Sequence, residues 1–315
     1  MKRLELESLL ADREAVKALL ERVGRDDPVG RISFNARLAS IESQLQALAQ
    51  QEDHTGSVAL LFAGAPVLGS RSISADFATT IIKTFQDLVT KRISAEEFGR
   101  LGSRGRVPER TASSLAIREL VRGSVGFVLE ESAPNAALAD TPVKKAISEV
   151  AELINQAAAE SDESYERSVE TVDPRLLVSL RDFFRALDDG NAALRIVENE
   201  RDASLDSTAV HRARLRVDAT DVEDTESDEV IGELLGLLPD ARKFEMKLST
   251  TREVIRGTVA AALATRWLEL IEQPNERLVG QTWRTKMRIR EIRERNRPPR
   301  RLFTLLDLIE SRGDS

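Results

Sequence analysis

The densest group of chemistry-bearing residues lies between Arg277 and Arg301, where ten basic residues and two acidic ones give a local charge of 10 − 2 = +8. Within it, basic residues alternate with packing residues, which on a β-strand places the cations on one face. A basic strand and a basic loop can bind phosphate backbones, because each Lys or Arg contact releases condensed counterions. The residues assigned to this face are Arg284, Lys286, Arg288, Arg290, Arg293, Arg295, Arg297, Arg300 and Arg301.

A second interpretation of this basic stripe stays open. Single-strand binders usually stack bases on exposed aromatic side chains, and the basic face has none, with Trp283 expected on the opposite side. The stripe could instead be a solvated face, or could bind an acidic segment of the same or a neighbouring chain. Residues 218–229 are such a segment, with seven Asp or Glu and no Lys or Arg.

A metal-dependent nuclease is a distant third hypothesis. Pro239-Asp240 and Glu245-Met246-Lys247 have the outline of a Pro-Asp…Glu-x-Lys site, in which two carboxylates bind a divalent cation. Only four residues separate Asp240 from Glu245, with Asp240 expected at a hairpin tip and Glu245 on the outward side of the next strand. A cross-strand ion pair or a solvated strand edge explains these residues better.

The other residue types and motifs of the sequence exclude several kinds of catalytic or metal site. The chain has no cysteine and only two histidines, so disulfides, thiolate metal sites and a three-histidine site within one chain are excluded. The glycines at 99, 102 and 105 lack the ending of a P-loop, and residues 123–126 lack the spacing of a nucleophile elbow. We therefore expect no cofactor, no metal and no small-molecule substrate, and a non-enzymatic protein.

The elements that position these residues begin with two helices in residues 1–52. Apolar residues recur at steps of three and four, which predicts an antiparallel, coiled-coil-like hairpin, with Ser33 as the N-cap of the second helix. Such a hairpin buries only a narrow seam, so we expect it to contact another domain or a second copy. The expected seam and oligomer interface comprises Leu6, Leu9, Val16, Leu20, Phe34, Leu38, Ile41, Leu45 and Leu48.

Residues 56–217 predict an α+β domain built on an antiparallel sheet. Hairpin signals outnumber crossovers, and Thr141-Pro142 and Asp173-Pro174 mark the starts of helices at about 142–159 and 174–188. Residues 193–198 and 208–217 are expected to pair as a hairpin, which would give Arg212, Arg214 and Arg216 a second basic strand face.

The acidic residues 218–229 repel one another and predict a linker. Beyond it, residues 230–311 predict five strands with a helix between the third and the fourth, which is the order of a small OB-like β-barrel. The expected fold class is thus α+β, with a helical hairpin, a central antiparallel-sheet domain and a C-terminal barrel.

Three short motifs of this barrel are similar to motifs in other proteins: residues 232–236 (GELLG), 244–248 (FEMKL) and 254–257 (VIRG). They resemble the C-terminal barrel of bacterial proteins that have no assigned function. In those proteins a helical hairpin, a region like residues 69–77 and a Gly-Ser-x-Gly-Phe turn like residues 123–127 come before the barrel. The resemblance implies the three-part architecture and carries over no catalytic residue.

Together these features favour a non-enzymatic interaction, regulatory or accessory protein of a bacterial system, with defence or stress response as one setting. Its expected partner is a protein or a second copy of itself, and the alternative is a nucleic-acid-binding accessory protein that uses the basic face on DNA or RNA. The start of the chain is charged and the longest nearly apolar stretch, residues 58–69, contains Pro66, so we expect a cytoplasmic location and no membrane partner.

Overall fold

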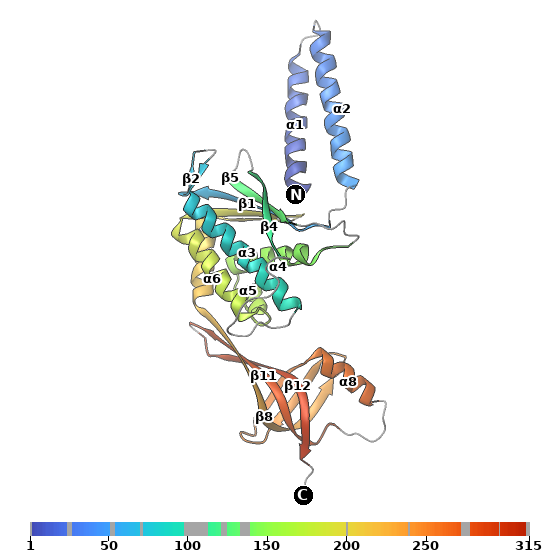
Figure 1. Ribbon diagram of the computed structural model, residues 1–315, viewed down its shortest axis with the longest axis vertical. Helices are drawn as coiled ribbons and strands as arrows, with labels where there is room; N and C mark the ends of the chain where they lie inside the picture. Colours follow the sequence, from blue (N-terminus) through green and yellow to red (C-terminus); the bar gives the residue numbers. More distant parts are fainter. Residues whose placement is uncertain are drawn as a thin grey trace. The chain divides into compact units, whose positions relative to one another are not determined.

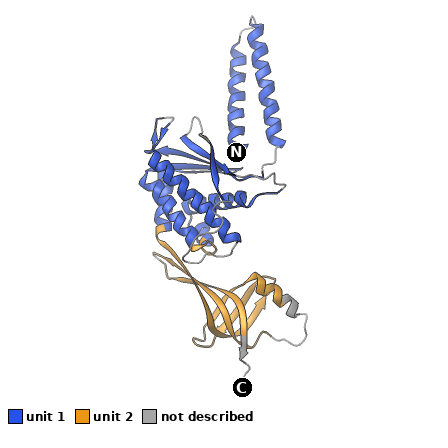
Figure 2. Cartoon of the chain, viewed as in Figure 1, with its two compact units in different colours: residues 1–168, 175–217 blue, residues 169–174, 218–315 orange. Residues whose placement is uncertain are grey.

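The computed structural model describes residues 2–23, 27–50, 54–69, 72–97, 113–120, 125–132, 139–199, 201–238, 240–271, 278–295 and 297–312. The chain forms two compact units, shown in Figure 2. Unit 1 comprises residues 1–168 and 175–217, and unit 2 comprises residues 169–174 and 218–315. Unit 1 holds the helical hairpin and an α+β body, and unit 2 holds the barrel.

The predicted helical hairpin is confirmed as α1 (Lys2–Arg22) and α2 (Pro28–Gln50). The second helix begins earlier than Ser33, the predicted cap. The backbone N–H of Gly30 donates to Oδ1 of Asp27 at 2.8 Å, and Pro28 occupies the first turn, where a missing N–H costs nothing. Ser33 is therefore an interior residue of the helix, because the Asp-Pro pair caps it one and a half turns upstream.

The base of the hairpin contacts the sheet of the α+β body. Leu4 packs against a small buried cluster on one sheet face, formed by Ala59, Leu61, Val128 and Val197. Beside this cluster, Nη2 of Arg195 lies 3.0 Å from both carboxylate oxygens of Glu7. A short apolar contact and an ion pair thus attach the start of α1 to the sheet.

The body contains a five-stranded antiparallel sheet with the order β4-β5-β1-β6-β7, so the predicted α+β class is confirmed. The most hydrophobic strand, β1, is central, and its first six residues are buried because both faces of the strand are covered. Phe62 packs against Phe77 of α3 (Ala75–Glu97) on one face, and Leu4 packs against Ala59 and Leu61 on the other. The strands are β1 (Ser57–Gly64), β4 (Leu115–Leu120), β5 (Val125–Glu131), β6 (Ala192–Glu198) and β7 (Arg201–Leu205), with a separate small pair formed by β2 (Val67–Leu68) and β3 (Ser72–Ile73).

Helices cover one face of this sheet (Figure 1). The helices predicted at Pro142 and Pro174 are present, and the hydroxyl of Thr141 accepts the N–H of Lys144 at 3.1 Å as an N-cap. Phe85 and Phe183 meet in the core with ring centroids 6.2 Å apart. The helices are α3 (Ala75–Glu97), α4 (Pro142–Ala158), α5 (Glu163–Val169) and α6 (Pro174–Asp189).

The predicted strand at 208–217 is wrong, because this segment is helix α7 (Ser207–Asp218). Its buried residues, Val210, Ala213 and Val217, have helical spacing, and Oδ1 of Asp206 accepts the N–H of Ala209 at 2.7 Å as an N-cap. The partner of β6 is β7 instead.

The three arginines of this segment consequently do not form a strand face. Nη1 of Arg214 lies 2.8 Å from Oδ2 of Asp188, whereas Nη1 of Arg216 donates to the carbonyl of Ala157 at 2.6 Å, near the end of α4. Arg212 lies on the same helix and is half-buried. The second basic strand face expected from the sequence does not form.

Unit 2 contains the predicted OB-like barrel, closed in the order β10-β12-β11-β8-β9. The third and fifth strands, β10 and β12, pair in parallel, and the other neighbours are antiparallel. The elements are β8 (Thr220–Leu238), β9 (Lys243–Leu248), β10 (Val254–Val259), α8 (Ala261–Ile271), β11 (Thr282–Glu294) and β12 (Arg300–Arg312).

The acidic linker predicted at 218–229 is also wrong. Asp218 ends α7 and β8 begins at Thr220, so the acidic residues form the first half of a 19-residue strand. Their mutual repulsion predicts an extended chain, which is correct, but their charge is balanced by the neighbouring strand β11 and not by solvent.

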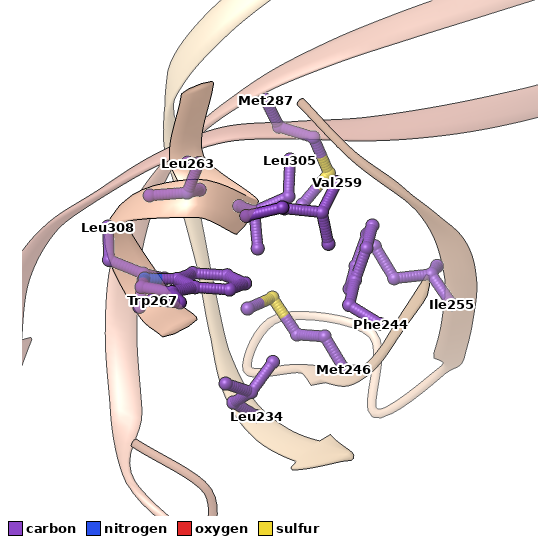
Figure 3. Packing of buried hydrophobic residues seen from close by; sticks show 11 residues of the cluster. Leu234, Phe244, Met246, Ile255, Val259, Leu263, Trp267, Met287, Leu305 and Leu308 are labelled. Atoms are coloured by element: carbon purple, nitrogen blue, oxygen red, sulfur yellow. The ribbon is translucent and has the colours of Figure 1, made fainter. Parts of the chain in front are cut away.

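The barrel is filled by aliphatic residues, two methionines, Phe244 and Trp267 of α8, which is 1% exposed (Figure 3). Closure requires Gly257, because a Cβ at this position would lie 2.1 Å from the carbonyl oxygen of Phe303 on the parallel strand. The buried cluster comprises Leu234, Phe244, Met246, Ile255, Val259, Leu263, Ala264, Trp267, Met287, Leu305 and Leu308.

Candidate functional site

The basic strand β11 pairs along its length with the acidic strand β8. In the antiparallel register Arg288 lies opposite Glu226 and Arg290 lies opposite Asp224. Opposite charges directly across a ladder stabilise the pairing. This arrangement matches the second interpretation of the stripe, in which the basic residues bind an acidic segment of the same chain.

Arg290 is the most deeply buried of the predicted basic residues, at 2% exposed. Its Nε and Nη2 lie 2.8 and 2.9 Å from the two carboxylate oxygens of Asp224. Its Nη1 donates to the carbonyls of Val169 at 3.1 Å and Glu170 at 2.8 Å, which belong to the part of unit 2 at the end of α5. This guanidinium therefore holds unit 2 together and is closed to an external phosphate.

Arg288 and Lys286 share one carboxylate. Nε and Nη2 of Arg288 lie 3.1 and 2.6 Å from Oε1 of Glu226, and Nζ of Lys286 lies 3.6 Å from Oε2. The hydrogen bond from Arg288 lowers the pKa of Glu226, and the positive charges of Arg288 and Lys286 lower it further. The carboxylate is thus ionised at neutral pH and neutralises part of the stripe.

The basic residues towards the β11–β12 loop are also paired. Nε of Arg293 and Nε of Arg301 lie 2.7 and 3.0 Å from Glu291, and these hydrogen bonds lower the pKa of Glu291. Nη1 of Arg300 lies 3.4 Å from Glu170, and Arg297 lies 3.6 Å from Glu294.

The two remaining predicted residues differ in exposure. Arg284 is half-buried in the barrel wall. Arg295 is exposed and makes no ion pair with the residues that the structure describes. The nine predicted residues are therefore brought together on β11, β12 and their loop, but most of their charge is used within unit 2.

The barrel has a groove on the face formed by β9, β10 and the end of β8, where OB barrels bind ligands. Its volume is about 680 Å³ and its lining is mainly apolar. Leu238 is 60% exposed at its edge, and Phe244 is 3% exposed. The lining residues are Gly236, Leu237, Leu238, Lys243, Phe244, Glu245, Arg256, Gly257 and Thr258.

The carboxylate considered for a nuclease site lies in this groove in an ion pair. Oε1 of Glu245 accepts hydrogen bonds from Nε and Nη2 of Arg256 at 2.9 and 2.7 Å, across the β9–β10 pair. Asp240 is exposed in the turn before β9. The Glu245–Arg256 contact is a cross-strand ion pair, one of the two arrangements expected from the sequence. Among the described residues no group of carboxylates or histidines could hold a metal ion.

Unit 1 has a second cleft, of about 790 Å³, between the end of α3, the start of α4 and the end of β6. Its charged side chains mostly pair with one another, such as Lys145 with Glu96, and Lys144 with Asp140 at 2.7 Å. Glu198 differs in being buried, at 4% exposed, and burial raises its pKa by more than the charge of Arg201 and a hydrogen bond with Ser148 lower it. Sequence reasoning missed it, because a glutamate at a strand end ordinarily faces solvent.

The predicted oligomerisation residues lie in the seam between α1 and α2 of one chain. Val16, Ile41 and Leu48 are buried there, and Leu6 is 39% exposed. The other members, Leu9, Leu20, Phe34, Leu38 and Leu45, are partly buried. The hairpin itself thus occupies most of the seam, and its contribution to oligomerisation stays a prediction.

The two histidines each lie beside a carboxylate. Nδ1 of His54 is 3.0 Å from Asp140, and Nδ1 of His211 is 3.2 Å from Asp188. The glycine-rich segment 99–105 and the turn residues 121–124 lie outside the described residues, whereas Gly126 belongs to β5 and not to the turn. No helix among the described residues has the length and apolarity needed to cross a membrane.

No family model matches the chain, and comparisons with curated proteins and with solved structures find no match. The three-part architecture implied by the resemblance is present, whereas no family is identified.

Proposed function

We propose that this protein is a non-enzymatic interaction component that associates with itself and binds an extended segment of a partner protein in the barrel groove. The observation that carries the proposal is the internal neutralisation of the basic stripe by β8. A nucleic acid would have to compete with these ion pairs, whereas the apolar groove is open.

The groove defines the chemistry of the partner. Leu237 and Leu238 offer apolar surface for aliphatic side chains. Arg256 is paired with Glu245, which leaves Lys243 as the cation of the rim. The matching ligand is an extended peptide with aliphatic side chains and an acidic residue placed to meet Lys243, since apolar contacts supply affinity and the charge supplies orientation.

A nucleic-acid ligand fits this groove poorly. Base stacking needs an aromatic face, and Phe244, the aromatic residue of the lining, is almost fully buried. The alternative function, nucleic-acid binding through the basic stripe, has exposed cations in Lys286, Arg293, Arg295, Arg297 and Arg301, of which Arg295 makes no ion pair with the described residues. It remains the hypothesis against which the proposal is tested.

The peptide proposal is tested by selecting a random-peptide phage library on the full-length protein. We expect enriched peptides to combine aliphatic residues with an acidic one, and their affinity to fall by at least about tenfold in Leu238→Glu and in Lys243→Glu. Leu235→Glu is the matched control, because Leu235 is 38% exposed on the same strand but does not line the groove. No enrichment, or equal binding by Leu238→Glu and by the control, contradicts the proposal.

The alternative is tested by fluorescence anisotropy with labelled single-stranded DNA, duplex DNA and RNA at low salt and at physiological salt. We expect only weak, sequence-independent binding at low salt, no tighter than roughly 1–100 μM at physiological salt. Tighter binding that is lost in Arg295→Glu or Arg301→Glu would instead establish the nucleic-acid function.

A further inference from the structure

The cleft of unit 1, between the end of α3, the start of α4 and the end of β6, is lined by more carboxylates than cations. Its volume of about 790 Å³ is that of a small-molecule site and far exceeds what a single ion needs. The lining carboxylates are Glu96, Glu97, Asp140, Glu149 and Glu198, and the lining cations are Lys144, Lys145 and Arg201. The formal charge of the lining is therefore −5 + 3 = −2.

Each cation of the lining already has a carboxylate partner. The ion pairs are Lys144–Asp140, Lys145–Glu96 and Arg201–Glu152, and a fourth joins Arg92 to Glu149. Arg92 and Glu152 do not line the cleft and their opposite charges cancel, so the excess of −2 is unchanged. The excess belongs to Glu97 and Glu198, which make no ion pair with the residues that the structure describes.

Glu198 lies at the buried end of the cleft, because only 4% of the residue is exposed. Burial raises the pKa of its carboxyl, and the charge of Arg201, across the β6–β7 pair, and a hydrogen bond with Ser148 lower it by less. The groups of the chain thus compensate the charge of the ionised carboxylate only in part. A carboxylate accepts about four hydrogen bonds, which leaves room for an external donor.

The rest of the lining indicates what kind of donor fits. Glu97 is exposed at the end of α3, so a second uncompensated carboxylate lies at the outer edge of the cleft. Ile93 and Pro142 add apolar surface to the lining. Among the described residues no group of three or more carboxylates or histidines is arranged to hold a metal ion, so the complementary cation is organic.

We infer that this cleft binds a linear aliphatic diamine, with one ammonium group at Glu198 and the other at Glu97. The two ammonium groups balance the excess charge of −2, and the aliphatic chain meets the apolar part of the lining. A lysine side chain of a partner protein offers the same ammonium and stem but a single charge, so it matches the cleft less well. The inference goes beyond the proposed function and is separate from the barrel groove, which belongs to unit 2.

Isothermal titration calorimetry of the full-length protein at physiological salt tests the site. The probes are putrescine, a four-carbon diamine, and butylamine, which has the same chain and one ammonium group. We expect saturable one-to-one binding of putrescine. Butylamine should bind at least about tenfold more weakly, because it leaves one carboxylate unpaired.

Three variants assign the two ends of the cleft. Glu198→Gln should weaken the binding of both probes by at least about tenfold, whereas Glu97→Gln should weaken only putrescine and bring its affinity close to that of butylamine. Arg201→Gln should bind both probes more tightly, because it removes a cation that lies opposite Glu198 in the ladder. Glu160→Gln, an exposed position of unit 1 outside the lining, is the matched control and should bind like the wild type.

Three results would overturn the inference. They are no saturable binding of putrescine at millimolar concentration, unchanged affinity in both Glu198→Gln and Glu97→Gln, and tighter binding of Nα-acetyl-lysine methylamide than of putrescine. The last result would assign the cleft to a lysine of a partner protein. Circular dichroism shows whether each variant is folded, and Glu97 is exposed, so Glu97→Gln still tests the site if Glu198→Gln does not fold. Peptide binding by the groove is measured separately, so failure of the cleft and failure of the groove give different results.

Discussion

Arg290 of β11 and Asp224 of β8 form a two-point ion pair inside unit 2, with N–O distances of 2.8 and 2.9 Å. The same guanidinium binds two backbone carbonyls at the end of α5, so its hydrogen bonds join three segments of the chain. Both partners are largely removed from water, at 2% and 17% side-chain exposure. A pair of this kind is costly to break, because the remaining charge stays buried alone.

We therefore predict that Arg290→Ala lowers the free energy of unfolding of unit 2 by about 3–5 kcal/mol. The chain has two tryptophans, Trp267 and Trp283, and both lie in unit 2, so tryptophan fluorescence during urea denaturation reports on this unit. Arg290→Lys keeps the charge but loses the two-point geometry, and its effect should be intermediate. An Arg290→Ala protein as stable as the wild type would show that the ion pair contributes nothing.

Gly257 should be intolerant of any side chain. We predict that Gly257→Ala destabilises unit 2 by more than about 2 kcal/mol, because its Cβ would meet the carbonyl of Phe303 where β10 and β12 close the barrel. Gly236→Ala is the control within the same barrel, since the nearest atom to its Cβ would be 3.7 Å away. The same fluorescence assay compares the two, and similar losses in both would argue against the closure role.

The ion pair between Glu7 and Arg195 should hold the start of α1 on the sheet. Both side chains are partly exposed, so Glu7→Ala should cost no more than about 1 kcal/mol. Hydrogen exchange is the sensitive measurement, and we expect faster exchange in the first turns of α1 with no change in unit 2. Glu5→Ala, an exposed neighbour on the same helix, should leave the exchange pattern unchanged.

Glu198 should make unit 1 less stable as the pH rises. Burial raises its folded pKa above the ordinary value of 4.5, so the folded state binds a proton that the unfolded state has lost. Stability is then lost from about pH 4.5 up to the raised folded pKa, at no more than about 1.4 kcal/mol per pH unit. Glu198→Gln should remove this dependence, measured by denaturation at a series of pH values. Parallel curves for the two proteins would contradict a raised pKa.

Much of the fold could be predicted because the local signals agree with the tertiary context. Apolar spacing predicts both hairpin helices, and the Thr141-Pro142 and Asp173-Pro174 signatures predict α4 and α6. Segment 208–217 is helical although the alternation of its arginines is typical of a strand. The residues that decide the matter, Val210, Ala213 and Val217, are recognised only when a core is available to bury them.

The candidate site was less predictable than the fold. The nine basic residues do gather on β11, β12 and their loop, as alternation and the strand order predict. Whether these residues are free to bind a ligand was not predictable, since it depends on the charges of the strand that lies beside β11. Glu198 gave no sequence signal, because its burial results from the packing of α4 against the end of β6.

The sequence by itself determined the three-part architecture and the segregation of charge, with +8 between 277 and 301 against −15 in the remaining residues (−7 − 8). Local spacing and composition are sufficient for both. Only the tertiary structure decided that the acidic segment is a barrel strand and that it neutralises the basic one. The physical reason is that strand pairing joins residues about sixty positions apart, and the register of that ladder, which places Asp224 against Arg290, exists only once the barrel closes.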